Sequence, residues 1–194
     1  MFERFSEGAR SVVTGAVGHA ERLDADTVTD EHMLLALLDR EGTRASFAFA
    51  SLGIRDRRTS VEHALADARR RGGLSKADAE ALAGIGIDVG RIVSKVEETH
   101  GEGALRADAT DGRPRRRRFA RRGFTPGAKG TLEKSLRIAV GRGDRHIGDE
   151  HILLALTAGP GVVAEVLADH GATYGTLERT MFGGTPPSAP PATG

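Results

Sequence analysis

The sequence predicts an all-α protein made of two similar four-helix units. The segment TDEHMLLALL at Thr29–Leu38 recurs as GDEHILLALT at Gly148–Thr157, and FSEGAR from Phe5 recurs as FTPGAK from Phe124. Both pairs lie 119 residues apart, which indicates a duplicated helical unit. Aromatic residues make up only 4% of the chain, and good helix formers such as Ala, Leu, Arg and Glu are frequent. This composition favours helices around an aliphatic core.

The first two helices follow from apolar spacing and from a helix-start signal. Thr29 or Asp30 offers a side-chain acceptor for the start of the second helix, and Glu31 follows in its first turn, where the helix dipole favours a negative charge. This helix is nearly apolar as far as Leu38, so we expect it to be buried. The first helix precedes it, and its apolar residues recur at three-to-four spacing: Phe5, Ala9, Val12, Val13, Ala16, Val17, Ala20 and Leu23.

Two shorter helices complete the first unit. A third helix is expected over Ala45–Leu52, ending at Gly53, which can adopt the left-handed conformation common after helix C-termini. A fourth helix is expected over Arg57–Arg70. Its inner face consists of four apolar residues, Val61, Ala64, Leu65 and Ala68.

The second unit repeats this plan. Asp149 and Glu150 start its buried helix, Gly171 ends its third helix, and a short last helix is expected over Tyr174–Phe182. A one-residue deletion near Gly159 shifts the later correspondences. The apolar stripe of its first helix consists of Ala128, Leu132, Leu136 and Ala139.

The segment between the two units contains a further pair of expected helices. Glu80–Glu98 resembles part of the first unit, and Asp88 is placed to cap a helix after a Gly-Ile turn. This pattern indicates an inserted helical hairpin, followed by an exposed linker rich in Gly, Asp and Arg. The expected organisation is a first repeat at 1–72, the hairpin at 73–100, a flexible Arg-rich linker at 101–123, a second repeat at 124–182 and a disordered Pro-rich tail at 183–194.

Composition and missing motifs restrict the function classes. The chain has no cysteine, which excludes disulfides, thiol catalysis and cysteine-zinc sites. No apolar run approaches the roughly 20 residues that span a bilayer, and the amino terminus lacks the apolar segment of a secretion signal, so a cytoplasmic location is expected. No G-x-x-x-x-G-K-[ST] phosphate loop and no Ser-His-Asp arrangement is found. We therefore expect no cofactor and no enzymatic activity.

The charge distribution is uneven. Arg113–Arg122 (RPRRRRFARR) contains seven arginines, so the rest of the chain has a net charge of −6 although the whole chain carries +1. Such a run can bind nucleic-acid phosphates or an acidic partner, with affinity that falls as salt rises. It can equally be a solvated linker. Nucleic-acid or acidic-partner binding through this segment is the alternative function.

The repeated motifs resemble the Clp N-terminal domain, the double-repeat module at the front of ClpC- and ClpA-type unfoldases. In that family each half opens with Phe-Thr-x-x-Ala-Lys/Arg and carries a Gly-Thr-Glu-His-Ile-Leu-Leu-Gly-Leu core. The matching segments are FSEGAR and FTPGAK, with TDEH and GDEH, and the resemblance covers 1–70 and 124–182. It implies two pseudo-symmetric repeats in a helical bundle and non-catalytic binding of clients, adaptors or an unfoldase in the Clp proteolysis system. Because the ATPase modules are not found in this sequence, an adaptor or decoy role is expected.

The resemblance also implies a ligand site. In ClpC-type proteins the residues matching Glu31 and Glu150 take part in recognising phosphorylated arginine, through charge-assisted bonds to its guanidinium. The resemblance assigns the hydroxyls to Ser6 and Thr125 and the nearby cations to Arg10 and Lys129. The alternative is that both glutamates only complement a helix dipole. Asp30 and Asp149 replace the family's Thr, which preserves a helix cap but adds negative charge beside the proposed phosphate.

Four of the matching positions bind cyclic-peptide antibiotics in some family members: Phe2, Arg10, Phe124 and Lys129. An exposed Phe at each repeat start would form an adhesive surface, and the alternative is that both rings belong to the core. His32, His146 and His151 do not follow a known metal-ligand spacing. We therefore expect no metal, and histidines that are hydrogen-bonded within each repeat.

Overall fold

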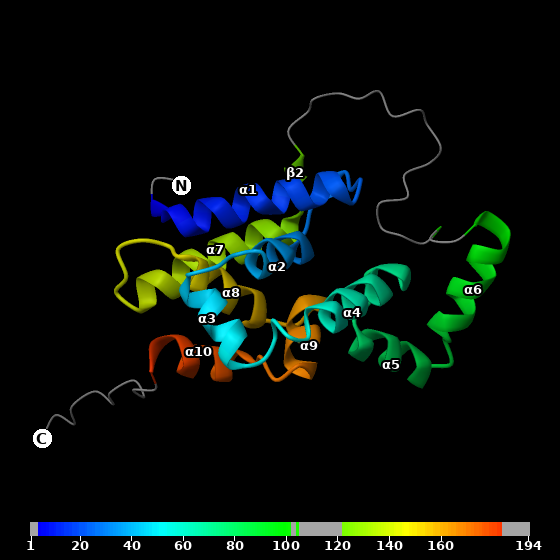
Figure 1. Cartoon of the computed structure of the whole chain (residues 1–194). Helices are drawn as coiled ribbons and strands as arrows, with labels where there is room; N and C mark the ends of the chain where they lie inside the picture. Colours follow the sequence, from blue (N-terminus) through cyan, green and yellow to red (C-terminus); the bar gives the residue numbers. More distant parts are fainter. Residues whose placement is uncertain (1–3, 102–103, 105–121, 184–194) are drawn as a thin grey trace, which may run out of the picture.

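The computed structural model describes residues 4–101, 104 and 122–183, which form a nearly all-helical molecule (Figure 1). The first repeat consists of α1 (Glu7–Arg22), α2 (Asp30–Leu38), α3 (Arg44–Ser51) and α4 (Arg58–Arg70). The inserted hairpin consists of α5 (Lys76–Gly84) and α6 (Val89–His100). The second repeat consists of α7 (Pro126–Gly141), α8 (Asp149–Thr157), α9 (Val162–Asp169) and α10 (Tyr174–Phe182). The predicted all-α fold of two four-helix repeats with an inserted hairpin is confirmed.

Short strands interlock the two repeats. Strand β1 (Thr27–Val28) pairs in parallel with β2 (Gly123–Phe124), so the entry to the second repeat lies beside the start of α2. The reciprocal pairing joins Phe5 to Ile147, just before α8. The backbone bonds match as well, because Ser6 N donates to Ile147 O at 2.9 Å and Thr125 N donates to Val28 O at 3.0 Å. The two pairings involve equivalent positions of the two repeats, with the roles of the repeats exchanged. The repeats are therefore related by a pseudo-twofold axis.

The two helices predicted to be buried lie at the centre of the molecule. All residues of α2 from His32 to Leu38 are buried, and so are all residues of α8 from His151 to Leu156. Helices α1 and α7 pack along α2 and α8, whereas α4 packs against α9 and α10 packs against α3 (Figure 1). The fourth helix of each repeat therefore contacts the third helix of the other repeat. Each fully buried leucine contributes about 1.5–3 kcal/mol, so this shared core holds the repeats together despite the long connection between them.

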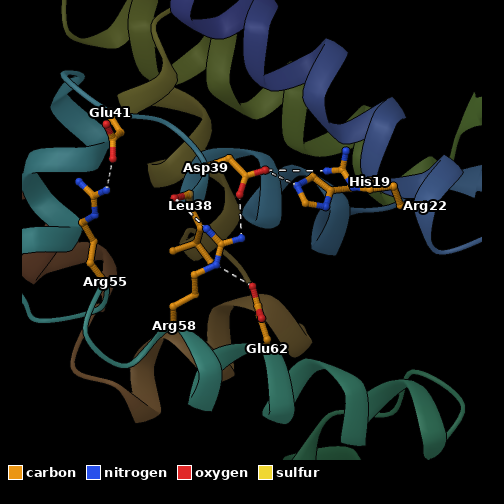
Figure 2. Close-up of polar contacts among 8 residues, drawn as sticks. All are labelled: His19, Arg22, Leu38, Asp39, Glu41, Arg55, Arg58 and Glu62. Atoms are coloured by element: carbon orange, nitrogen blue, oxygen red, sulfur yellow. Dashed lines mark hydrogen bonds and ion pairs between the residues drawn. The ribbon is translucent and has the colours of Figure 1, made fainter.

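A polar network fixes α4 against α1 and the end of α2. Figure 2 shows Asp39, which follows α2, accepting hydrogen bonds from His19 of α1 and Arg58 of α4, both at 2.7 Å. Arg58 also bonds Glu62 at 2.7 Å and reaches the Leu38 carbonyl at 3.4 Å. Burial acts to raise the pKa of Asp39, but hydrogen bonds from Arg58 and His19 hold it below the ordinary value. The network sets the orientation of α4, whose far end reaches the candidate site.

The α5–α6 hairpin projects from the body of the molecule (Figure 1). Glu165 of α9 attaches it, because its carboxylate accepts hydrogen bonds from the backbone N–H groups of Lys76 at 2.7 Å and Ala77 at 3.2 Å. The first N–H groups of a helix have no acceptor within that helix, and a carboxylate is favoured at this end. Ile85 and Ile92 of the hairpin remain 73% and 47% exposed.

Local differences from the expected elements occur at helix ends. Gly53 and Gly171 follow α3 and α9 with φ of +66° and +85°, as predicted. Leu23, predicted to continue the apolar stripe of α1, is 44% exposed. The helix ends at Arg22 and the chain turns through Asp24 at φ +52°, so Leu23 no longer follows the stripe. Within the described ranges, no single helix is long and apolar enough to cross a membrane, and only α8 and α9 together reach that length, bent by 94°.

Candidate functional site: a cavity between the repeats

The two glutamates singled out in the sequence are the second residues of α2 and α8. Glu31 forms an ion pair with Arg69 of α4, in the same repeat, with an Oε1–Nη1 distance of 2.6 Å. Glu150 lies 3.9 Å from Arg44 of α3, in the other repeat. Their side chains are only 13% and 14% exposed. Both carboxylates thus already lie beside a guanidinium supplied by the chain itself.

A cavity of about 290 Å³ opens beside Glu31. It lies where the start of α2 and the face of α4 meet the start of α9, so both repeats form its walls. Apolar side chains dominate the lining, and the polar ones gather at the α2 end. The lining residues are Thr29, Asp30, Glu31, His32, Leu65, Ala68, Arg69, Gly73, Thr125, Leu156, Pro160, Gly161, Val162, Val163 and Ala164.

The proposed ligand hydroxyls are helix caps. Ser6 Oγ accepts from Ala9 N at 3.1 Å at the start of α1, and Thr125 Oγ1 accepts from Ala128 N at 3.2 Å at the start of α7. Thr125 also lines the cavity of Glu31, although it belongs to the other repeat. The structure therefore brings this hydroxyl to the glutamate across the repeat boundary.

The other sequence-predicted site residues are placed less closely. Arg10 and Lys129 are exposed on α1 and α7, and neither lines the cavity. Phe124 lies in β2, half-buried against the core. Phe2 lies outside the described residues, as does the Arg113–Arg122 segment apart from its last, half-buried residue. Glu31 and Thr125 therefore line the same cavity, whereas Arg10 and Lys129 lie outside it.

Of the two cap candidates at the start of α2, Thr29 is the N-cap and Asp30 is the first helical residue. Asp149 is likewise the first helical residue of α8, so neither aspartate caps its own helix, and each side chain lies beside the other repeat. Asp30 lies at the start of α7, with Oδ2 3.5 Å from where a β-carbon on Gly127 would lie. Asp149 lies at the start of α1, with Oδ1 at the same distance from the corresponding point on Gly8. Burial raises the pKa of Asp30, against the lowering effects of a hydrogen bond from Thr131 and the charge of Lys134. Each carboxylate therefore packs beside the first turn of the first helix of the other repeat.

Both repeats share a histidine that caps the start of the central helix. His32 Nδ1 accepts the Thr29 N–H at 3.0 Å, and His151 Nδ1 accepts the Gly148 N–H at 2.9 Å. Burial and then the charge of Arg69 lower the pKa of His32 to about 4. The prediction of histidines bonded within each repeat is confirmed. His146 is exposed, and within the described residues no cluster of His, Cys, Asp or Glu is arranged to hold a metal ion.

Phe182 is a site residue that the sequence did not reveal. Its ring lies 6.1 Å from the His151 ring, with the Arg142 guanidinium 3.5 Å and the Arg44 guanidinium 5.7 Å from its centroid. It stands at the end of the last helix and has no counterpart in the repeated motifs, so no sequence signal pointed to it. The second repeat thus places an aromatic ring over its histidine cap.

The chain is similar in sequence to a Clp domain family and to named Clp proteins. Residues 123–184 match the Clp repeat (R) N-terminal domain family. The chain is 32% identical over 183 residues to the chloroplastic "ATP-dependent Clp protease ATP-binding subunit ClpA homolog" of Brassica napus, covering 94% of this chain and 16% of that protein. It is 29% identical over 183 residues to "Chaperone protein ClpB" of Oceanobacillus iheyensis, covering 94% and 17%. The chain thus spans about one sixth of the length of these curated relatives.

A solved structure shares the fold. The N-terminal domain of the caseinolytic protease associated chaperone ClpD from Arabidopsis thaliana superimposes with a TM-score of 0.52 and 19% sequence identity. The match covers 93% of this chain and 94% of that one. At this identity the likeness shows the fold alone.

Proposed function

Because this chain carries a Clp repeat N-terminal domain, we propose that it is a non-catalytic module that binds segments of client polypeptides in the cavity beside Glu31. Its relatives are named as a chaperone and as an ATP-binding subunit of a Clp protease. We infer that the region this chain shares with them contributes binding rather than chemistry. In a system that delivers proteins to an unfoldase, capture of a client is the step that a helical repeat module can perform.

The cavity is the observation that carries this proposal. Its volume of about 290 Å³ is close to the lower end of ligand sites, roughly 300 Å³, and suits one large side chain rather than a whole small molecule. Mostly apolar walls with a few convergent polar groups are typical of binding sites. Because α4 and α9 come from different repeats, the site exists only in the paired fold.

The resemblance implies phosphoarginine-bearing segments and cyclic peptides as ligands. The carboxylate of Glu31, which the resemblance assigns to the ligand guanidinium, is already paired with the guanidinium of Arg69 at 2.6 Å. Phe124, half-buried against the core, offers little exposed ring for a cyclic peptide. Client polypeptides are therefore the ligand class that we propose.

The test uses a permanently unfolded protein, reduced and carboxymethylated α-lactalbumin, carrying a fluorophore for anisotropy measurements. The Ala164→Phe variant fills the cavity from α9, and the matched control is Ala168→Phe, which adds the same ring at an exposed position one turn further along. We expect binding by the wild type, a loss of about tenfold or more in affinity for Ala164→Phe, and little change for the control. No binding by the folded wild type, or equal affinities for both variants, would overturn the proposal. Circular dichroism confirms that both variants are folded.

A further inference from the structure

We propose that the cavity beside Glu31 accepts an uncharged aromatic side chain of the client and discriminates against phosphoarginine. This inference rests on the proposed function and names the ligand of that same cavity. Three features of the described residues support it: the charged groups at the cavity are already paired, the remaining walls are apolar, and an aromatic side chain lies at the corresponding place in the second repeat.

The charged groups that would bind phosphoarginine already have partners within the chain. The carboxylate of Glu31 lies 2.6 Å from the guanidinium of Arg69, which occupies the place of a ligand guanidinium. Asp30 also lines the cavity, and its carboxylate packs against the first turn of α7, with Oδ2 3.5 Å from where a β-carbon on Gly127 would lie. A phosphate that entered the cavity would therefore come close to a second carboxylate, and like charges at short range repel.

The part of the cavity that remains is apolar. Leu65 and Ala68 line it from α4, Leu156 from the end of α8, and Val162 and Val163 from α9. A charged ligand group in this space would lose its hydration without gaining a new partner, which is costly. An apolar side chain gains from the same transfer in proportion to the surface that it buries.

Phe182 shows which kind of side chain such a place accepts. By the repeat correspondence, His151 and Arg44 are the counterparts of the cavity residues His32 and Val162, and both lie against the Phe182 ring. Arg142 adds a guanidinium 3.5 Å from the ring centroid. In the first repeat Arg69 of α4 lines the cavity. A client aromatic ring would thus have a histidine, a guanidinium and an aliphatic wall around it, the contacts that favour cation–π stacking.

The test is an NMR titration of the ¹⁵N-labelled protein with three capped heptapeptides, Gly-Ser-Gly-Xaa-Gly-Ser-Gly, in which Xaa is Phe, Arg or phosphoarginine. We expect the Phe peptide to shift the amides of Ala68 and Val163 saturably and to bind about tenfold or more tightly than the phosphoarginine peptide. Equal or tighter binding of the phosphoarginine peptide at these amides overturns the inference. So does a Phe peptide that leaves them unshifted.

A substitution adds a second readout. Asp30→Thr removes the carboxylate from the start of α7, so the phosphoarginine peptide should gain about tenfold in affinity while the Phe peptide changes little. No gain for phosphoarginine in the folded variant contradicts the role of Asp30. The two proposals fail differently: if unfolded α-lactalbumin needs the cavity but the phosphoarginine peptide binds better, only the aromatic inference fails. If α-lactalbumin binding is indifferent to Ala164→Phe, the proposed site itself fails.

Discussion

The histidine cap of α2 makes stability depend on pH in a predictable direction. His32 is 3% exposed, and its Nδ1 accepts the Thr29 N–H at 3.0 Å while lying 2.9 Å from Thr29 Oγ1. A proton on Nδ1 would remove that acceptor and bury a charge. Burial, followed by the charges of Arg69, His19 and Arg122, accordingly lowers the pKa of His32 to about 4, from 6.5.

The magnitude follows from linkage. Between pH 6.5 and about 4 the unfolded chain binds this proton and the folded chain does not, so the free energy of unfolding falls as the pH falls through that window. A difference of about 2.5 pKa units corresponds to about 3 kcal/mol of free energy of unfolding, to order of magnitude. This contribution is present in full above pH 6.5 and lost near pH 4. Burial lowers the pKa of His151 as well, against its hydrogen bond to Asp144, so the second repeat acts in the same direction.

The assay compares urea unfolding at pH 7 and pH 4.5 for the wild type, His32→Gln and the control His63→Gln, whose residue is exposed on α4. Gln at this position can still accept the N-cap N–H but does not titrate. We expect the wild type and the control to lose about 2–3 kcal/mol more than His32→Gln on acidification. Equal losses in all three proteins, or an NMR titration of His32 with a midpoint near 6.5, would refute the reasoning.

Two further predictions concern the attachment of the hairpin and the Phe182 ring. Glu165→Ala removes the carboxylate that caps α5, at a cost of about 1–2 kcal/mol, so amide hydrogen exchange in α5 and α6 should accelerate about 5- to 30-fold. Glu165→Gln should lie between, and unchanged exchange would show that the hairpin is held by other contacts. Phe182→Ala removes a half-buried ring and its stacking on Arg142, which should lower the free energy of unfolding by about 2 kcal/mol in urea titrations. It should also let a second Phe peptide bind beside His151, and a loss below about 0.5 kcal/mol with unchanged stoichiometry would contradict both effects.

The sequence sufficed for the helices because their signals are local. Apolar spacing of three to four residues, an acid in the first turn and a glycine after the last turn all act within one element. They predicted α10 at Tyr174–Phe182 and the Asp88 cap of α6, where Asp88 Oδ1 accepts from Arg91 N at 3.0 Å. The duplication also predicted pseudo-equivalent glutamates, and the structure places both at the second position of a central helix.

The same local signals failed where a side chain acts on a distant segment. Asp30 at a helix start has the composition of a cap, yet its carboxylate lies at the start of α7, on the other repeat. Sequence periodicity carries no information about which helix end a neighbouring carboxylate faces, because that depends on how two helices pack. The prediction for Leu23 was wrong for a related reason, since a backbone turn at Asp24 ended the helix before the stripe did.

By itself, the sequence determined the duplicated all-α plan, the buried α2 and α8 helices and the glutamate that begins each of them. Tertiary structure alone decided that α4 and α9 enclose a cavity beside Glu31, and that Phe182 lies over the corresponding histidine in the second repeat. The physical reason is that helix formation depends on residues three and four apart, whereas cavities and interhelical charge pairs depend on packing between helices that are distant in the sequence.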